Sequence, residues 1–332
     1  MKNILLVGGA GYVGTVVTSH LLKKGYKVTV LDNFVYDQHF SVLSFIGGSD
    51  YTFIKGDMNN NADLEKTLQD GVTDVILMAG LVGDPITKKY PEASGIINEK
   101  GVQNCMNFFN KKGINKMVFI STCSNYGLIK ENELANEEFE LNPLSLYSKA
   151  KVANEIYLME KKGKVDYTGV VLRFSTAFGL SPRMRFDLSV SEFVKDIFLG
   201  RDLLVYDEHT WRPYCHVRDF ARLLEMVVEA DNSLVSFEVF NAGGDKNNFT
   251  KKMIVDEILK LIPDGKVSYG TGGGDPRNYR VNFNKLKNRL GFEPEFSIPY
   301  GIKELVNALS IGLYSDVEEN KNKYGNYLIH YV

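Results

Sequence analysis

The chain has 332 residues, of which 44% are hydrophobic, and its formal net charge is −2 at pH 7. This composition is ordinary for a globular protein, and the balance of charge excludes a global attraction to nucleic acid or to an anionic membrane. The three cysteines are widely spaced and lack the spacing of zinc ligands, so we expect reduced thiols, no metal site and a cytoplasmic location. The chain begins directly with an apolar run, and no run reaches the roughly 18 residues of a membrane span. We therefore expect neither a signal peptide nor a membrane segment.

The first 32 residues carry a dinucleotide-binding pattern. The apolar run at 4–7 predicts a buried strand, and the apolar period over 12–24 predicts a helix. Between them, Gly8-Gly-Ala-Gly-Tyr-Val-Gly14 fits both Gly-x-Gly-x-x-Gly and Gly-x-x-Gly-x-x-Gly. Such glycines let the backbone approach a pyrophosphate at the start of the helix. A second strand ends in Asp32, whose carboxylate can accept ribose hydroxyls and would repel a 2′-phosphate, so NAD is favoured over NADP.

Strands and helices continue to alternate after Asp32. We predict strands at 51–55, 74–78, 116–120 and 168–172, and helices at 61–68, 93–112 and 145–162. Asn61 is expected to cap the first of these helices, with Glu65 completing a capping box. The alternation predicts an α/β fold with a doubly wound parallel sheet of the Rossmann type, whose ligands bind at the carboxyl ends of the strands.

Beyond about Phe174 the predicted strands and helices alternate less regularly. Helices are predicted at 188–199, 217–230, 250–261 and 302–311, and short strands at 203–205, 238–240 and 266–269. This pattern predicts a smaller C-terminal α/β lobe over the ligand edge of the sheet. We therefore expect an NAD-binding domain at 1–174 that includes the helix of Tyr147, a substrate-binding lobe at 175–314, and a tail at 315–332 that docks on the body or on a neighbouring subunit.

Tyr147 and Lys151 form the sharpest chemical pattern. Residues four apart in a helix share a face. A phenol with a pKa near 10 is a poor acid or base at neutral pH, but an adjacent ammonium favours the phenolate and should lower that pKa. The phenol could then take a proton from a sugar hydroxyl while a nicotinamide takes the hydride. Thr122, at the end of the fifth predicted strand, can hold the substrate oxygen. The Tyr-x-x-x-Lys spacing alone is common on solvent-exposed helices. Its position downstream of a dinucleotide-binding motif is what favours a catalytic role.

These motifs together resemble the extended short-chain dehydrogenase/reductases of the NAD-dependent epimerase/dehydratase type, over residues 1–314. The resemblance rests on the glycine motif, Asp32-Asn33, Gly56-Asp57, the run 121–127, Tyr147-x-x-x-Lys151 and the run 212–219. It implies a triad of Thr122, Tyr147 and Lys151, with Tyr147 as the acid/base. It also implies that the cofactor is bound by Gly8, Gly11, Tyr12, Val13, Asp32, Asn33, Asp57, Met58, Ala79, Gly80, Leu81, Asn98, Tyr147 and Lys151.

The two residues after Thr122 differ from those of the dehydratases in this family, and this difference limits the reactions that we expect. Sugar-nucleotide 4,6-dehydratases carry an Asp-Glu pair directly after the triad threonine, where this chain has Cys123 and Ser124. Neither residue is a plausible acid for expelling water, so we do not expect dehydration. Oxidation, reduction or epimerisation remains, most plausibly at C4 of a sugar.

Arginines of the second half predict a site for a nucleotide diphosphate sugar, because guanidinium forks bind pyrophosphate oxygens bidentately. The predicted substrate contacts are Ser124, Arg183, Arg185, Arg212 and Arg277. The runs 79–85, 181–187 and 207–212 are similar to those of a subgroup, the GDP-heptose 4-dehydrogenases of bacterial capsule pathways. That resemblance favours a GDP-sugar and a role in surface-polysaccharide synthesis.

Several functions stay open at this point. The leading interpretation is a 4-dehydrogenase or a 4-epimerase, and the residues do not separate the two. A catalytically idle NAD-binding scaffold or sensor and an NADP-dependent keto-sugar reductase are the alternatives. Family members pair through two helices that correspond here to 93–112 and 145–162, which implies a homodimer or a higher homo-oligomer.

Overall fold

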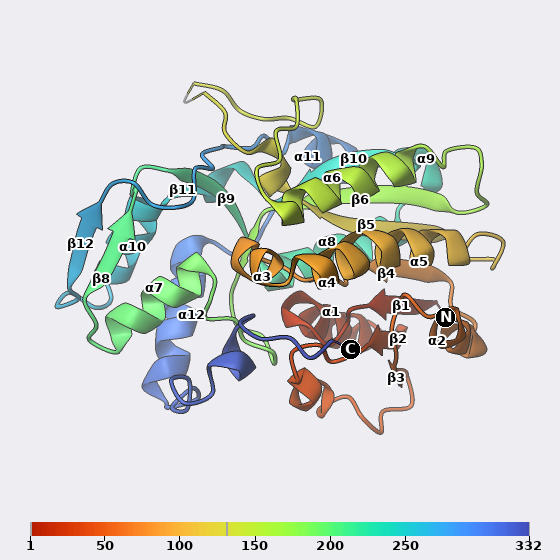
Figure 1. Cartoon of the computed structure of the whole chain (residues 1–332), viewed down its shortest axis with the longest axis horizontal. Coiled ribbons are helices and arrows are strands. Elements are labelled where there is room, and N and C mark those ends of the chain that lie inside the picture. Colours follow the sequence, from red (N-terminus) through yellow and green to blue (C-terminus); the bar gives the residue numbers. More distant parts are fainter. Residues whose placement is uncertain (1, 131, 332) are drawn as a thin grey trace.

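The computed structural model describes residues 2–130 and 132–331, and its centre is a parallel sheet of seven strands (Figure 1). The strands lie in the order β10-β6-β5-β4-β1-β2-β3. Their bounds are β1 (Asn3–Val7), β2 (Lys27–Asp32), β3 (Tyr51–Lys55), β4 (Asp74–Leu77), β5 (Lys116–Thr122), β6 (Thr168–Phe174) and β10 (Glu238–Ala242). The order reverses at β1, which has β2 on one side and β4 on the other. This is the predicted Rossmann arrangement.

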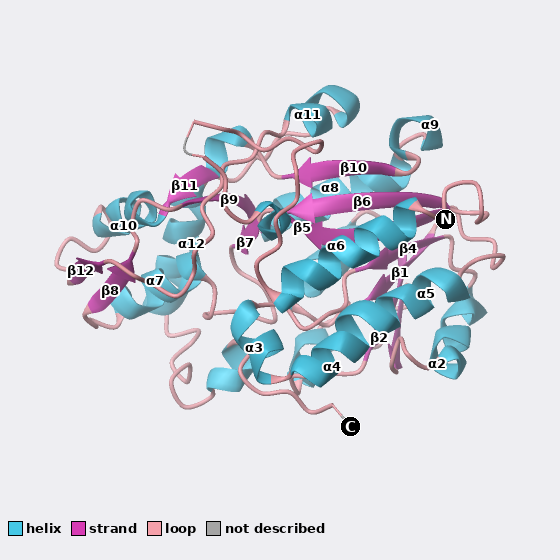
Figure 2. Cartoon of the chain, turned by 45° about the horizontal axis from the view of Figure 1, so that its top comes forward, coloured by secondary structure: helices cyan, strands magenta, loops and turns pink. Residues whose placement is uncertain are grey.

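Side chains of each strand alternate between two cores, one on each face of the sheet (Figure 2). Ile4 of β1 belongs to the core that includes Val17 and Phe220, whereas its neighbour Leu5 belongs to the core that includes Val102. The first core lies under α1 (Tyr12–Lys23) and α8 (Val217–Glu229). The other face carries α4 (Pro91–Gly95), α5 (Val102–Phe108) and α6 (Leu146–Met159), with α2 (Asn61–Lys66) at the β3 edge.

A smaller lobe stands beside the carboxyl ends of the strands (Figure 1). It contains a three-stranded sheet of β7 (Thr176–Phe178), β9 (Trp211–His216) and β11 (Asn248–Thr250), and a pair of β8 (Leu203–Tyr206) and β12 (Val267–Gly270). Its helices are α7 (Ser189–Phe198), α10 (Lys251–Leu259) and α12 (Ile298–Ser310), and Val194, Ile254 and Ile302 share their apolar core. Two short helices, α9 (Asn232–Val235) and α11 (Asn284–Leu290), lie near β10.

The chain does not separate into lobes at a single point. The strand predicted at 238–240 was expected in the smaller lobe, but β10 pairs with β6 as the seventh strand of the main sheet. Phe240 of β10 is fully buried in the core that α1 and α8 cover. Residues 217–242 therefore belong to the main Rossmann domain, because their apolar side chains pack in its core and β10 pairs with the edge of β6.

Three local predictions on helices need correction. The residue that caps α2 is Asn60, whose side chain accepts a hydrogen bond from the backbone N–H of Ala62, and Glu65 instead pairs with Lys112 at 3.0 Å. The helix predicted at 93–112 consists of α4, a π-helical turn (Ile96–Gly101) and α5, and it ends at Phe108. A six-residue helix, α3 (Asp84–Lys89), was missed. None of the helices formed by the described residues is long and apolar enough to cross a membrane.

Candidate active site

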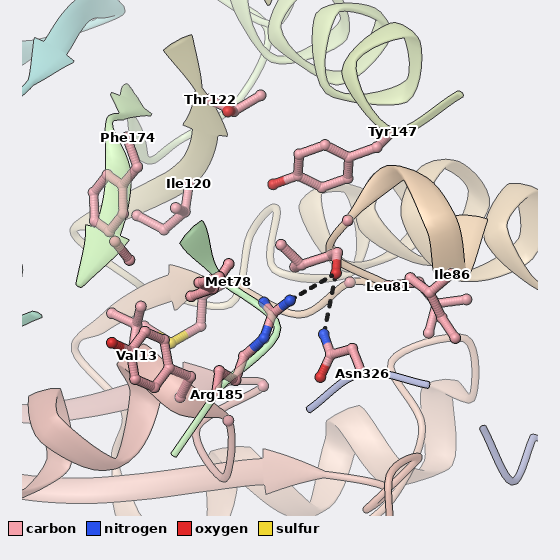
Figure 3. Close-up of a pocket in the computed structure, with 18 of the residues that line it drawn as sticks. Val13, Met78, Leu81, Ile86, Ile120, Thr122, Tyr147, Phe174, Arg185 and Asn326 are labelled. Atoms are coloured by element: carbon pink, nitrogen blue, oxygen red, sulfur yellow. Dashed lines mark hydrogen bonds between the residues drawn. The ribbon is translucent and has the colours of Figure 1, made fainter. Parts of the chain in front are cut away.

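A cavity of about 540 Å³ opens between the carboxyl ends of the main sheet and the smaller lobe (Figure 3). This is the edge at which open α/β sheets bind their ligands. The predicted site residues that line it are Gly8, Gly11, Tyr12, Val13, Asp32, Asn33, Asp57, Met58, Ala79, Gly80, Leu81, Thr122, Ser124, Tyr147, Lys151, Arg183, Arg185, Arg212 and Arg277. Tertiary folding thus brings the predicted cofactor, catalytic and substrate residues to one space.

The glycine-rich turn has the geometry that a pyrophosphate requires. Gly8 has a φ of +88°, and a Cβ atom built there would lie 2.6 Å from Cα of Ala79. A Cβ atom on Gly14 would lie 2.6 Å from the carbonyl oxygen of Gly9, so the start of α1 packs directly on the turn. Among the described residues no side chain caps α1 at Gly11, which leaves its first N–H groups available to an anion.

Asp32 is held at the end of β2 by backbone and amide donors. Its Oδ2 accepts the N–H of Ala10 at 3.0 Å, and its Oδ1 accepts the N–H of Phe34 at 2.9 Å and Nε2 of Gln38 at 3.2 Å. Burial raises the pKa of Asp32, and the two backbone hydrogen bonds act against that rise. Because a carboxylate offers about four acceptor sites, it can still accept a ribose hydroxyl. The turn and this carboxylate together fit NAD.

Asn98 is the one predicted cofactor residue that does not line the cavity. Its side chain is buried behind the wall, where Oδ1 accepts the N–H of Leu81 at 2.7 Å and Nδ2 donates to the carbonyl of Leu81 at 3.0 Å. Asn98 therefore positions the backbone of the segment after β4, which forms the wall. A direct contact with the cofactor stays a prediction.

Tyr147 and Thr122 face the cavity from two neighbouring walls, and Figure 3 shows the Tyr147 hydroxyl directed into it. Ser145 caps α6 by accepting the N–H of Ser148, which fixes the first turn that carries Tyr147. Lys151, one turn later, is only 3% exposed. Its Nζ donates to the carbonyl of Ile120 at 2.6 Å, and burial lowers the pKa of Lys151 to about 7.

The predicted acidification of Tyr147 is not what this structure shows. Burial raises the pKa of Tyr147 above its ordinary value. The spacing of the two residues put them on one helix face, but it did not specify where the amine points. The buried ammonium lies 5.7 Å from the Tyr147 ring centre and bonds to the end of β5 instead. The position of the amine therefore does not provide the predicted acidification of the phenol.

A buried ion pair that we did not predict from the sequence lies behind the predicted catalytic residues. Glu155 lies one turn beyond Lys151 and pairs with Arg173 of β6 at 2.7 Å, with exposed side-chain fractions of 4% and 6%. The same carboxylate accepts hydrogen bonds from Ser121 and, at 2.7 Å, from Asn125. It therefore ties α6 to the end of β5. A glutamate four residues after Lys151 and an arginine inside an apolar strand were the available signals.

The predicted arginines form two groups in the cavity wall. Arg212 and Arg277 share the carboxylate of Asp275 at 3.0 and 2.7 Å, and Arg277 donates to Oγ of Ser124 at 3.3 Å. Because Ser124 follows Thr122 closely, this group borders the catalytic residues.

Arg183 and Arg185 form the second group. Arg183 is buried over the ring of Tyr36, and its charge interacts with that of Asp32. Arg185 makes a bidentate pair with Asp187 at 3.0 and 2.6 Å. All four arginines line the cavity, and their contact with a nucleotide diphosphate stays a prediction.

A parallel sheet that reverses at a glycine-rich turn, with a Tyr-x-x-x-Lys helix at its carboxyl edge, defines the extended short-chain dehydrogenase/reductase class. Within this class, the chain belongs to the NAD-dependent epimerase/dehydratase family, whose model matches residues 4–243. The cofactor of the family is NAD, and the residues of the cavity fit it.

Individual relatives align along almost the whole chain. A UDP-glucuronate 4-epimerase of Thermodesulfobacterium geofontis is 27% identical, over 92% of this chain and 96% of its own length. The protein CapI of Staphylococcus aureus is 25% identical, over 92% of this chain and 97% of its own. The crystal structure of a UDP-glucose 4-epimerase from Thermotoga maritima, with UDP-glucose, is 25% identical and has a TM-score of 0.83, over 94% of this chain and 100% of that one. The family and these relatives make the chain an NAD-dependent enzyme of nucleotide-sugar chemistry.

Proposed function

We propose that the chain oxidises C4 of a nucleotide diphosphate sugar to a 4-keto sugar, as a 4-epimerase or as a net 4-dehydrogenase. One observation carries the proposal: Thr122, Tyr147 and Lys151 line the same cavity as the glycine-rich turn and the pair Arg212 and Arg277. A sugar nucleotide anchored at the arginines would present its ring between Tyr147 and the cofactor. Two relatives named as 4-epimerases support C4 as the reacting carbon.

Tyr147, Thr122 and Lys151 would each have a separate role in the oxidation of C4. Tyr147 would exchange the proton of the C4 hydroxyl, since its hydroxyl points into the cavity and a positioned tyrosine can act as a general acid or base. Thr122 holds the same oxygen through its hydroxyl. The Lys151 amine lies 5.7 Å from the Tyr147 ring centre and, when protonated, would place a positive charge near the phenol. When bound, NAD supplies the hydride acceptor.

The absence of an acid pair next to Thr122 keeps the reaction at the keto stage. Cys123 is buried and donates to the carbonyl of Arg173 at 3.1 Å, and burial raises the pKa of its thiol well above the ordinary value. Ser124 is engaged by Arg277 and by Tyr279 at 3.2 Å. Neither group is placed as an acid that would expel a hydroxyl, which argues against dehydration.

The proposed substrate and pathway rest on the resemblance of the runs 79–85, 181–187 and 207–212 to the GDP-heptose 4-dehydrogenase subgroup. This resemblance favours a GDP-sugar and a role in surface-polysaccharide synthesis. We further propose that the enzyme acts in the cytoplasm and as a homodimer.

The experiment is to incubate the purified protein and NAD with GDP-, UDP-, CDP- and dTDP-sugars and to analyse the products by NMR. An inverted C4 identifies an epimerase, and a released 4-keto sugar with NADH identifies a dehydrogenase. Tyr147→Phe should reduce kcat by about 10²- to 10⁴-fold, the range of general acid–base catalysis. No product with any of these sugars, or full activity in Tyr147→Phe, would refute the proposal and favour the idle scaffold.

A further inference from the structure

The segment 325–331, which we name the C-terminal strap, contributes Asn326 and Tyr327 to the cavity wall. It follows α12 and a 3₁₀ turn (Lys321–Tyr324) of the smaller lobe and ends over the loops after β2 and β3 (Figure 1). The sequence assigned no function to this segment beyond docking. Its contacts are with the smaller lobe and with the loops after β2, β3 and β4.

The first half of the strap is bonded to both lobes. Arg183 donates to the carbonyl of Gly325 at 2.8 Å. The N–H of Asn326 donates to Asp187 at 3.2 Å, and its side-chain amide donates to the carbonyl of Val82 at 3.1 Å. Figure 3 shows Asn326 and Arg185 meeting at that carbonyl, inside the cavity. This half of the strap therefore joins the smaller lobe to the segment after β4.

Tyr327 continues the same wall. Asn326 and Tyr327 both line the cavity, and the carbonyl of Tyr327 accepts Nζ of Lys89 from α3 at 3.1 Å. The neighbouring Leu328 is 48% exposed and does not line the cavity. Asn326 and Tyr327 thus line the cavity, whereas Leu328 lies outside it.

The second half of the strap lies over the predicted adenosine end. The N–H of His330 donates to the carbonyl of Val35, just after β2, at 2.8 Å. The hydroxyl of Tyr331 accepts Nδ2 of Asn59 at 3.3 Å, and burial together with the neighbouring Asp57 raises the pKa of Tyr331 to about 12. Asp57 is a predicted adenine contact, so the strap ends where the outer end of the dinucleotide would lie.

We propose that the strap completes the dinucleotide site and retains the nicotinamide dinucleotide during turnover, with Asn326 and Tyr327 as binding residues. It spans the loops after β2, β3 and β4, which carry the predicted cofactor residues, and it bonds to the lobe opposite. A dinucleotide held beneath it leaves only when these contacts break. Retention suits a reaction in which the same cofactor takes and returns a hydride, and to that extent the inference rests on the proposed function.

The test measures release of NADH by stopped-flow fluorescence, with excess NAD as competitor and no sugar present. Removing residues 325–332 should raise the dissociation rate constant of NADH at least tenfold. Asn326→Ala and Tyr327→Ala should each raise it about threefold or more. Leu328→Ala is the matched control, because it changes the same segment outside the cavity, and its rate should stay within a factor of two of the wild type.

If the truncated chain does not fold, Asn326→Ala and Tyr327→Ala test the proposal by themselves. Far-UV circular dichroism checks that each variant is folded. Unchanged NADH release in a folded truncated chain, or in both Asn326→Ala and Tyr327→Ala, would overturn the proposal. So would an equal acceleration in Leu328→Ala. Because the measurement uses no sugar, a failure to turn over any sugar nucleotide would refute the proposed function and leave the strap standing.

Discussion

Replacing Lys151 with methionine should stabilise the nucleotide-free protein at low pH and not at high pH. The Lys151 side chain is 3% exposed, and burial lowers its pKa from 10.5 to about 7. At about 1.36 kcal/mol per pKa unit, keeping this amine charged in the folded protein costs about 5 kcal/mol below pH 7. Methionine has a similar shape and carries no charge, so it removes that cost.

The sign of the pH dependence follows from which state binds the proton. Between about pH 7 and pH 10.5 the unfolded chain holds a proton on Lys151 that the folded chain has released. The unfolding free energy of the wild type therefore rises with pH in this window, by about 1.4 kcal/mol per unit. Methionine has no such slope, and it loses the hydrogen bond to Ile120, worth about 1.5–3 kcal/mol for a charged donor.

We therefore expect Lys151→Met to be about 2–3 kcal/mol more stable than the wild type at pH 6 and about equal to it at pH 9. Urea unfolding at both pH values, followed by circular dichroism, measures the difference. Lys149→Met, at an exposed position of the same helix, is the control and should give the same small difference at both. A pH-independent difference for Lys151→Met would refute the reasoning that burial of this amine is costly. Lys151→Met should also lose activity, because a group that is needed for catalysis can lower the stability of the folded protein.

Two further predictions test the support of the site and the assembly. Glu155→Gln leaves the buried Arg173 without its counter-ion and should lower the unfolding free energy by about 3–5 kcal/mol in urea at pH 7; a loss below about 1 kcal/mol would show that the pair is dispensable. Ile156 is 55% exposed on α6, one of the two predicted pairing helices, so Ile156→Glu should convert a dimer to a monomer by burying an unpaired charge. Light scattering after size exclusion measures the mass, and a monomeric wild type would contradict the predicted dimer.

Much of the site could be predicted because its signals are local in the sequence. The glycine motif specifies a turn whose backbone only glycine allows, as Gly8 with its φ of +88° demonstrates. The step from that turn to Asp32 is the length of one helix and one strand, and the spacing from Tyr147 to Lys151 is one helical turn. Such relations depend on backbone geometry within a few residues.

What only the tertiary structure decided depends on contacts between distant segments. Strand β10 pairs with β6, and its Phe240 packs in the core that α1 and α8 cover. The spacing of apolar residues within the strand does not indicate which strand it pairs with. The amine of Lys151 in α6 donates to the carbonyl of Ile120 in β5, a partner distant in the sequence. The strap at 325–331 acquires its place only when the loops after β2, β3 and β4 lie side by side. Sequence thus determined the elements and their chemistry, and packing determined which of them meet.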